Sequence, residues 1–191
     1  MPLIMNETVS WYLAPSPQIA TAKKELCPTR DVFQARLDTF YREMVALKIL
    51  IEDEAALLAA VCGEIGNNCF DHNLGQWADS VGCWFSYQDD LNHNSVLVTV
   101  ADRGQGLLNS LKRVQLDLQT EEEAIQIAFK RKISGRSPEK RGNGLKFVRS
   151  VINGSDKRGL LFYSGRAKIE LGGLHLLEQG PGRFLWRAGA I

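Results

Sequence analysis

Apolar side chains recur every three or four residues along two stretches of the N-terminal half, which is the spacing of helices that bury one face. The first stretch predicts a helix over 31–50, with Asp31 as its N-cap. Its apolar positions are Phe33, Leu37, Phe40, Tyr41 and Met44. The second stretch predicts a helix over 53–73, whose apolar face carries Leu57, Leu58, Val61 and Ile65. Residues 1–30 show no such periodicity and are expected to be irregular.

The rest of the chain contains segments that alternate apolar and polar positions at the spacing of strands. Segments 81–87 and 95–101 are rich in aromatic and β-branched residues and flank a turn-rich stretch, which predicts an antiparallel hairpin. Further strands are expected at 160–163, 167–171 and 184–188, and further helices at about 120–132 and 144–152. The order of these elements predicts an α+β fold, with helices packed on one face of a mainly antiparallel sheet.

The second helix becomes polar on the face where its apolar side chains should continue. At about 100° per residue, Asn68 lies about 40° from Glu64, His72 about 80° and Asp71 about −20°. Buried polar groups without partners cost roughly 1–3 kcal/mol each, so this end of the helix either projects into water or meets a ligand. Carboxylate and carboxamide oxygens are ligands that magnesium prefers, which makes a hydrated cation with a polyanion the functional alternative.

Two glycine-rich motifs follow in the chain. Asp102-x-Gly104-x-Gly106 comes directly after a strand, where an aspartate can accept a hydrogen bond from an exocyclic amine and glycines let the backbone approach a flat ligand. Gly142-Asn143-Gly144-Leu145 opens a helix, whose first backbone N–H groups attract phosphate. Each motif alone is weak. Neither is a P-loop, because the chain has no Gly-Lys-Ser/Thr, and the βαβ unit of a dinucleotide fingerprint is missing.

Composition narrows the class of protein. The 191 residues carry 23 Lys and Arg against 22 Asp and Glu, a net charge of +1, which argues against a general nucleic-acid binder. No apolar run approaches the roughly 18 residues of a membrane span, and the N-terminus lacks the pattern of a signal peptide. The four cysteines are expected as buried thiols, with a zinc site from Cys69, His72 and Cys83 as the alternative. We therefore expect a cytoplasmic protein without a nucleic-acid or membrane partner.

Three motifs together resemble those of the GHKL ATPase superfamily, in their order and in their helix or strand context. They are Glu64-x-x-x-Asn68, Asp102-x-Gly104-x-Gly106 and Gly142-x-Gly144-Leu145. The superfamily includes type II topoisomerases, a heat-shock chaperone, histidine kinases, mismatch-repair ATPases and anti-sigma serine kinases. The resemblance covers about residues 50–190 and implies the Bergerat fold, a two-layer α/β sandwich with helices on one face of a mixed, mainly antiparallel sheet. It implies one ATPase domain over 31–191, with an ATP lid at about 107–141.

The resemblance also implies a role for the motif residues. Glu64 would be the general base that activates or orients the nucleophile, and Asn68 would bind the magnesium ion that bridges the phosphates. Asp102 would accept a hydrogen bond from the adenine amino group. The other expected ATP-binding residues are Asp71, His72, Gly104, Gly106, Lys140, Arg141, Gly142, Asn143, Gly144 and Leu145. Lys140 and Arg141 belong to a basic stretch of the lid that suits a triphosphate through charge-assisted contacts.

In its domain organisation, the chain is most similar to the stand-alone anti-sigma-type serine kinases. Topoisomerase and chaperone relatives carry further large domains, and the predicted helix over 31–50 has no phosphoacceptor histidine. The resemblance implies a Mg-ATP-dependent kinase or ATPase of signal transduction that phosphorylates or switches a separate protein partner. Pro181-Gly182-Arg183-Phe184 resembles a further, weaker glycine motif of the family, in which threonine stands at the position of Arg183. A non-catalytic nucleotide-sensing module is the alternative function, and this departure at Arg183 favours it slightly. The apolar face of the helix over 31–50 either packs on the domain or forms a homodimer or partner interface.

Overall fold

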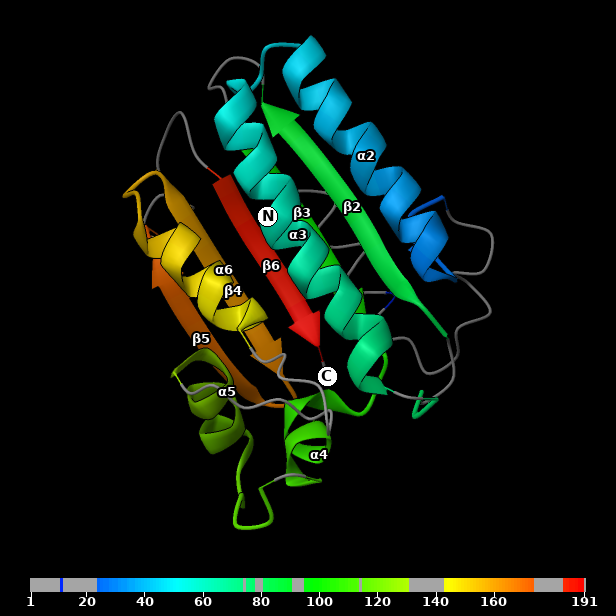
Figure 1. Ribbon diagram of the computed structural model, residues 1–191, viewed down its shortest axis with the longest axis vertical. Coiled ribbons are helices and arrows are strands. Elements are labelled where there is room, and N and C mark those ends of the chain that lie inside the picture. Colours follow the sequence, from blue (N-terminus) through cyan, green and yellow to red (C-terminus); the bar gives the residue numbers. More distant parts are fainter. Residues whose placement is uncertain are drawn as a thin grey trace.

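The computed structural model describes Trp11 and residues 24–73, 75–77, 81–90, 95–113, 115–130, 143–173 and 184–190, with residues 90, 95 and 184–190 as backbone only. The described residues form five helices and six strands (Figure 1). The helices are α2 (Arg30–Ala46), α3 (Glu52–Asn73), α4 (Gly106–Lys112), α5 (Glu121–Lys130) and α6 (Gly144–Asn153). The strands are β1 (Leu26–Cys27), β2 (Cys83–Asp90), β3 (Ser95–Asp102), β4 (Arg158–Ser164), β5 (Ala167–Gly172) and β6 (Phe184–Ala190). The predicted α+β class is confirmed.

One sheet joins the six strands in the order β1-β2-β3-β6-β4-β5. β1 pairs with β2, β2 with β3 and β4 with β5 in antiparallel fashion, whereas β6 lies parallel to both β3 and β4. The predicted hairpin is present, with Cys83 opposite Asp102. Its first strand begins at Cys83 rather than at 81 and continues to Asp90. The sequence did not predict β1, because two residues are too few to show alternation.

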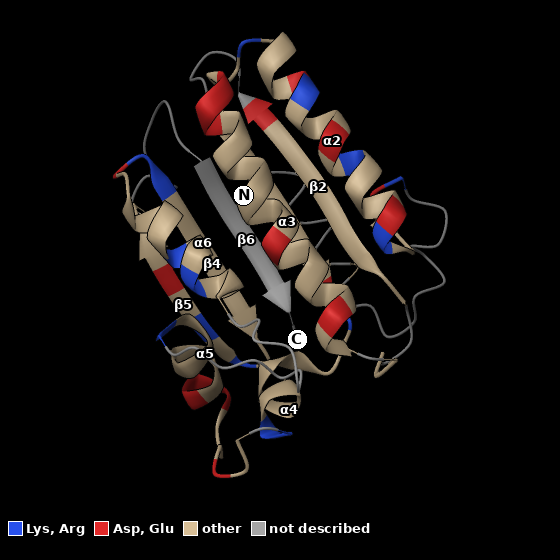
Figure 2. Ribbon diagram, in the orientation of Figure 1, with Lys and Arg blue, Asp and Glu red and all other residues tan. Residues whose placement is uncertain are grey.

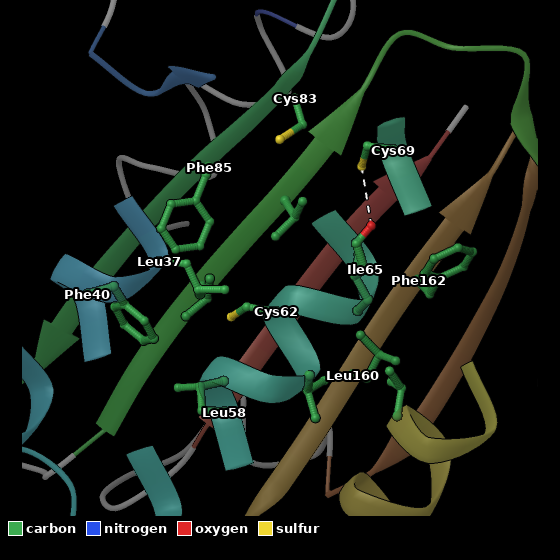
Figure 3. Packing of buried hydrophobic residues seen from close by; sticks show 14 of the residues in the cluster. Leu37, Phe40, Leu58, Cys62, Ile65, Cys69, Cys83, Phe85, Leu160 and Phe162 are labelled. Atoms are coloured by element: carbon green, nitrogen blue, oxygen red, sulfur yellow. Dashed lines mark hydrogen bonds between the residues drawn. The ribbon is translucent and has the colours of Figure 1, made fainter. Parts of the chain in front are cut away.

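Helices α2, α3 and α6 lie over the same face of this sheet, with α3 between the other two (Figure 1). Alternate strand residues face these helices, as the period of two along a strand requires. Those from β3 and β4 are fully or nearly fully buried; they are Val96, Val98, Val100, Leu160 and Phe162. Figure 3 shows Cys62 and Ile65 of α3 between the aromatic side chains on the β2 side and Leu160 and Phe162 on the β4 side. The main core therefore lies between α3 and the sheet.

Helix α2 begins and ends at residues other than those the sequence predicted. Its N-cap is Thr29, whose hydroxyl accepts a hydrogen bond from Val32 N at 3.4 Å. Asp31 lies in the first turn, so its assignment as the cap is wrong, although a carboxylate there still suits the helix dipole. The helix ends at Ala46 rather than at 50, because the chain turns through Lys48, whose φ is 55°.

The apolar face of α2 packs within the chain. Its buried residues are Phe33, Leu37, Phe40 and Met44. Phe33 and Phe40 both meet Phe85 of β2 edge-on, with ring centroids 5.5 and 5.9 Å apart. Of the two alternatives for this face, packing on the domain is therefore the one observed.

The segment over 107–141, expected as an ATP lid, is helical and packed in its described part. The sequence did not predict α4, and it predicted α5 at about 120–132. Thr120 and Glu123 form a capping box at the start of α5: Glu123 N donates to Thr120 Oγ1 at 3.2 Å, and Thr120 N donates to Glu123 Oε2 at 3.1 Å. Phe129 of α5 enters the main core and meets Phe162 at 5.3 Å. This half of the expected lid is thus an integral part of the fold.

Trp11 packs against the opposite face of the sheet. Trp11 is buried and packs its ring on Trp84 of β2 at 5.5 Å. Arg103 donates a hydrogen bond to the carbonyl of Trp11 at 2.9 Å, and its guanidinium lies 5.9 Å above the same ring. Residues 1–30 are therefore not irregular throughout, since Trp11 and β1 belong to the packed fold.

Four further features concern the cysteines, metal ligands, membrane spans and charge distribution of the described residues. All four cysteines are buried thiols, as predicted. Among the described residues, no group of three or more His, Cys, Asp or Glu side chains could hold a metal ion, so the alternative of a zinc site is not supported. No helix in the described part of the chain is long and apolar enough to cross a membrane. Acidic residues gather in the first turns of α3 and α5, where the helix dipole favours them (Figure 2).

Two glycines of α3 allow the packing of α2 on α3 to be tested. A Cβ at Gly66 would lie 2.1 Å from Cζ of the fully buried Phe33, whereas a Cβ at Gly63 would lie 3.5 Å from Leu37, an ordinary contact. Overpacking a core costs typically about 1–3 kcal/mol, so we expect Gly66→Ala to lower the free energy of unfolding by about that amount. Gly63→Ala should raise it by roughly 0.5–1 kcal/mol, because alanine favours the helix. Urea unfolding measures both, and equal effects of the two substitutions would contradict this packing.

Candidate functional site

A cavity of about 40 Å³ lies where the C-terminal half of α3, the end of β3 and the starts of α4 and α6 meet. Its lining residues are Ile65, Asn68, Cys69, His72, Asn73, Val100, Asp102, Gly106, Leu107, Ser110, Leu145 and Phe162. The walls combine apolar side chains with a few convergent polar groups, which is typical of small-molecule sites. Members of all three sequence motifs are among them.

The cavity explains why the apolar face of α3 turns polar. Five lining residues of α3 are spaced at the helical period and share one side of the helix; they are Ile65, Asn68, Cys69, His72 and Asn73. Asn73 is only 4% exposed, and Asn68 and His72 are half-buried. The polar end of this face therefore lines a cavity and does not project into bulk water.

Asp102 is the buried carboxyl group of the site. It is 2% exposed at the end of β3, where its Oδ1 accepts hydrogen bonds from Gly104 N at 2.8 Å and from Asn73 Nδ2 at 3.0 Å. Burial raises the pKa of Asp102 to about 6, because the hydrogen bonds from Asn73, Gly104 and the Cys69 thiol do not offset the lost hydration. A buried acceptor of this kind suits a ligand that presents an N–H group to the cavity.

Gly104 and Gly106 are each required to be glycine, but for different physical reasons. A Cβ at Gly104 would lie 1.8 Å from Oδ1 of Asn73, so only glycine allows this loop to close on the end of α3. Gly106 has a φ of 73°, a left-handed conformation that glycine adopts without strain, and it lines the cavity at the start of α4. Gly104 is not among the lining residues; it shapes the site through Asn73.

Glu64 and the start of α6 lie against each other. Glu64 is exposed, and a Cβ at Gly144 would lie 2.3 Å from Glu64 Oε2 and 4.0 Å from Asn68 Nδ2. The first motif and the last one therefore meet at the edge of the cavity. Leu145 lines the cavity itself, and Asn143 is the N-cap of α6, where it makes no side-chain capping hydrogen bond.

The remaining expected site residues differ in where the structure places them. Asp71 forms an ion pair with Arg30 of α2 and does not line the cavity. His72 lines it, and its Nδ1 lies 3.3 Å from the Ser110 hydroxyl. Lys140, Arg141 and Gly142 fall outside the described residues, as does Arg183.

The structure adds three polar residues that sequence reasoning missed. Asn73 Nδ2 donates a hydrogen bond to Asp102 Oδ1, and Gln105 N donates one to Asn73 Oδ1 at 2.9 Å. Ser110 lines the cavity from α4. A signal for Asn73 was present, since it lies four residues after Cys69 on the face that carries the apolar side chains. The link to Asp102 had no such signal, because the two residues are far apart in the chain.

The polar groups at the edge of the cavity fit a magnesium ion in part. Asn68 offers a carboxamide oxygen, and Glu64 adds a carboxylate beside it. Magnesium commonly takes one or two protein oxygens and fills its remaining positions with water and substrate phosphate oxygens. This donor set therefore suits magnesium that arrives with a phosphate ligand, rather than a metal held by protein alone.

Comparisons with known proteins give no family for the chain. No protein-family model matches it, and no curated protein or solved structure matches it either. The function is therefore argued from the residues around the cavity.

The raised pKa of Asp102 predicts how the free energy of unfolding depends on pH. The folded-state value of about 6 exceeds the ordinary 3.8, so the folded protein binds this proton more tightly than the unfolded chain does. Asp102 therefore destabilises the fold above about pH 6, and this effect fades as the pH falls toward about 4. We expect Asp102→Asn to gain stability relative to the wild type by up to roughly 3 kcal/mol at about pH 7.5, and to gain little at about pH 4.

Urea unfolding across this pH range measures the difference between the two proteins. Asp53→Asn, at an exposed position in the first turn of α3, is the matched control and should keep the wild-type slope between about pH 5 and pH 7. A difference between Asp102→Asn and the wild type that does not vary with pH would contradict the burial of a titrating carboxyl group.

Proposed function

We propose that the chain is an ATP-binding regulatory domain of the GHKL type, with the two-layer Bergerat arrangement. The packing of α2, α3 and α6 over one face of a mixed sheet supports this arrangement (Figure 1). The strongest support is the convergence of the three motifs. Asn68, Asp102, Gly106 and Leu145 line one cavity, and Glu64 meets Gly144 at its edge.

The adenine end of ATP would lie in the cavity. Asp102 offers a carboxylate oxygen to the amino group of the base, and the apolar walls flank the ring. These walls are Ile65, Val100, Leu107, Leu145 and Phe162. Glycine at 106 keeps the wall of α4 free of a side chain at its first residue, where a flat ligand can approach the backbone.

The phosphates would lie at the edge of the cavity, beside the start of α6. The first-turn N–H groups of a helix have no intrahelical acceptors and attract phosphate. Magnesium would supply charge neutralisation and orientation of the phosphate oxygens, with Asn68 as its protein ligand. Glu64 would accept the proton of the attacking hydroxyl or water, which is the usual role of a carboxylate in phosphoryl transfer. Lys140 and Arg141 remain candidates for further phosphate contacts.

A cavity of about 40 Å³ is smaller than the roughly 300–1,000 Å³ of typical ligand pockets. ATP binding therefore requires it to widen. The wall formed by Leu107 and Ser110 belongs to α4, a helix of seven residues, which makes this wall easier to shift than α3 with its 22 residues.

The activity that we favour is transfer of the γ-phosphoryl group to a Ser or Thr of a separate protein, or slow hydrolysis of ATP, in a cytoplasmic signalling role. The presence of Glu64 supports a catalytic role. The alternative is a nucleotide-sensing module that changes partner binding without chemistry, which the sequence departure at Arg183 supports.

Calorimetric titration with Mg-ATP tests the binding of the nucleotide. We expect the wild type to bind and Asp102→Asn to bind about ten- to a hundredfold more weakly, because a hydrogen bond to a charged acceptor is lost. Chelation of magnesium should also weaken binding. Asp156→Asn, in an exposed turn, is the control and should bind as the wild type does. If the wild type does not bind ATP, the proposal is wrong. If Asp102→Asn binds ATP as tightly as the wild type, Asp102 does not recognise the base.

Glu64→Gln tests the chemistry separately from binding. The substitution keeps the side-chain shape against Gly144 but removes the base, so turnover should fall at least about a hundredfold while ATP affinity changes little. Phosphate release and transfer of labelled phosphate to proteins of a cell extract measure turnover. Glu170→Gln, on the exposed side of β5, is the control. A wild type that binds ATP but shows neither hydrolysis nor transfer would instead favour the nucleotide-sensing module.

A further inference from the structure

Asn73, the last residue of α3, is a buried side chain to which the proposed mechanism gives no role. It is 4% exposed, and its amide group has partners at both ends. Nδ2 donates to Asp102 Oδ1 at 3.0 Å and to the carbonyl of Cys69 at 2.6 Å, while Oδ1 accepts a hydrogen bond from Gln105 N at 2.9 Å. One side chain thus connects the end of α3 to both ends of the loop over 102–105.

The partners determine which way this amide points. A backbone N–H can only donate, so the atom that meets Gln105 N must be the carbonyl oxygen of Asn73. The NH2 group then faces the Cys69 carbonyl and the Asp102 carboxylate, which can both accept. A flipped amide would place an oxygen against these two acceptors and an NH2 group against a donor. Asn73 therefore approaches Asp102 as a hydrogen-bond donor.

The loop around Asn73 fixes how Asp102 is held. A Cβ at Gly104 would lie 1.8 Å from Oδ1 of Asn73 and 2.1 Å from its Nδ2, so the amide fills the space that glycine leaves. Gly104 N also donates to Asp102 Oδ1, at 2.8 Å. These two donors therefore converge on Oδ1, and the Cys69 thiol is a further donor to the carboxylate. An ionised carboxylate has about four acceptor sites, so Asp102 retains capacity for a donor from the cavity that it lines.

We propose that Asn73 is a positioning residue for base recognition, which donates to Oδ1 of Asp102 and thereby holds the carboxylate in place to accept a hydrogen bond from the exocyclic amino group of a 6-aminopurine. This inference rests on the proposed ATP-binding function. Without the Asn73 amide, the carboxylate of Asp102 loses one of its hydrogen-bond donors and can rotate. The amino group of the base then meets a misplaced acceptor. Asn73 thus acts on the choice of base and not on the binding of the phosphates.

Three triphosphates that differ at the 6 position of the purine provide the test: ATP, inosine triphosphate with a 6-oxo group, and purine riboside triphosphate with hydrogen. We expect Asn73→Ala to weaken ATP binding about tenfold, which corresponds to one hydrogen bond of a charged group. Binding of purine riboside triphosphate should change less than about twofold, because this ligand offers no amino group to Asp102. The preference for ATP over the other two should shrink accordingly.

Two further variants complete the experiment. Asn67→Ala is the matched control, because Asn67 lies on the same helix but accepts from Gln34 Nε2 of α2 at 3.0 Å and does not line the cavity. It should leave all three affinities unchanged. Gly104→Ala displaces the Asn73 amide without removing it and should reproduce the loss of base preference. It also carries the test if Asn73→Ala does not fold, which thermal unfolding of each variant shows.

The outcomes separate this inference from the proposed function. If the wild type prefers ATP and Asn73→Ala weakens all three triphosphates equally, Asn73 has a structural role only and the inference is wrong, while ATP binding stands. Unchanged affinities in both Asn73→Ala and Gly104→Ala would overturn it as well. If the wild type binds none of the three triphosphates, the proposed function fails and the inference fails with it.

Discussion

The burial of Asp102 is the constraint on which the site depends. A carboxyl group that is 2% exposed loses its hydration, and its pKa of about 6 reflects that cost. Only hydrogen-bond donors can offset the cost, and here they come from Gly104 N in the loop and from Asn73 and the Cys69 thiol in the last turn of α3. The C-terminus of α3 is therefore tied to the end of β3. This connection places Asn68 and His72 along the cavity wall.

The same helix also carries the hydrophobic core, so the site and the core depend on each other. The N-terminal half of α3 buries Ala55, Leu58, Val61 and Cys62 against its neighbours. Arg158 of β4 bonds Glu54 of α3 at 2.6 and 3.2 Å and the Val151 carbonyl of α6 at 2.8 Å, which joins three elements at that end. The position of α6 relative to α3, and with it the approach of Gly144 to Glu64, follows from this packing.

The sequence predicted what depends on local pattern, and it missed what depends on distant partners. The periodicity of α3 and the alternation of the β2–β3 hairpin are local, and both were predicted to within a few residues. The motifs also predicted that Asn68 and Asp102 would share a site, and they line one cavity. The N-cap of α2 was missed because Thr29 and Asp31 are both capping types, and only side-chain reach selects one. Asn73 was missed because its partner lies across the fold.

The segment expected as a lid shows how packing limits motion around the site. α4 and α5 share a small core of Leu111, Leu118 and Ala124. Glu121 accepts a hydrogen bond from Arg166 N at 2.6 Å, which fastens α5 to the turn between β4 and β5. Burying a phenylalanine stabilises by about 1.5–3 kcal/mol, and swinging α5 away would expose Phe129 as well as break this bond. α5 is therefore a fixed wall of the fold. The widening that the proposed binding of ATP requires would have to come from α4, which borders the cavity through Leu107 and Ser110.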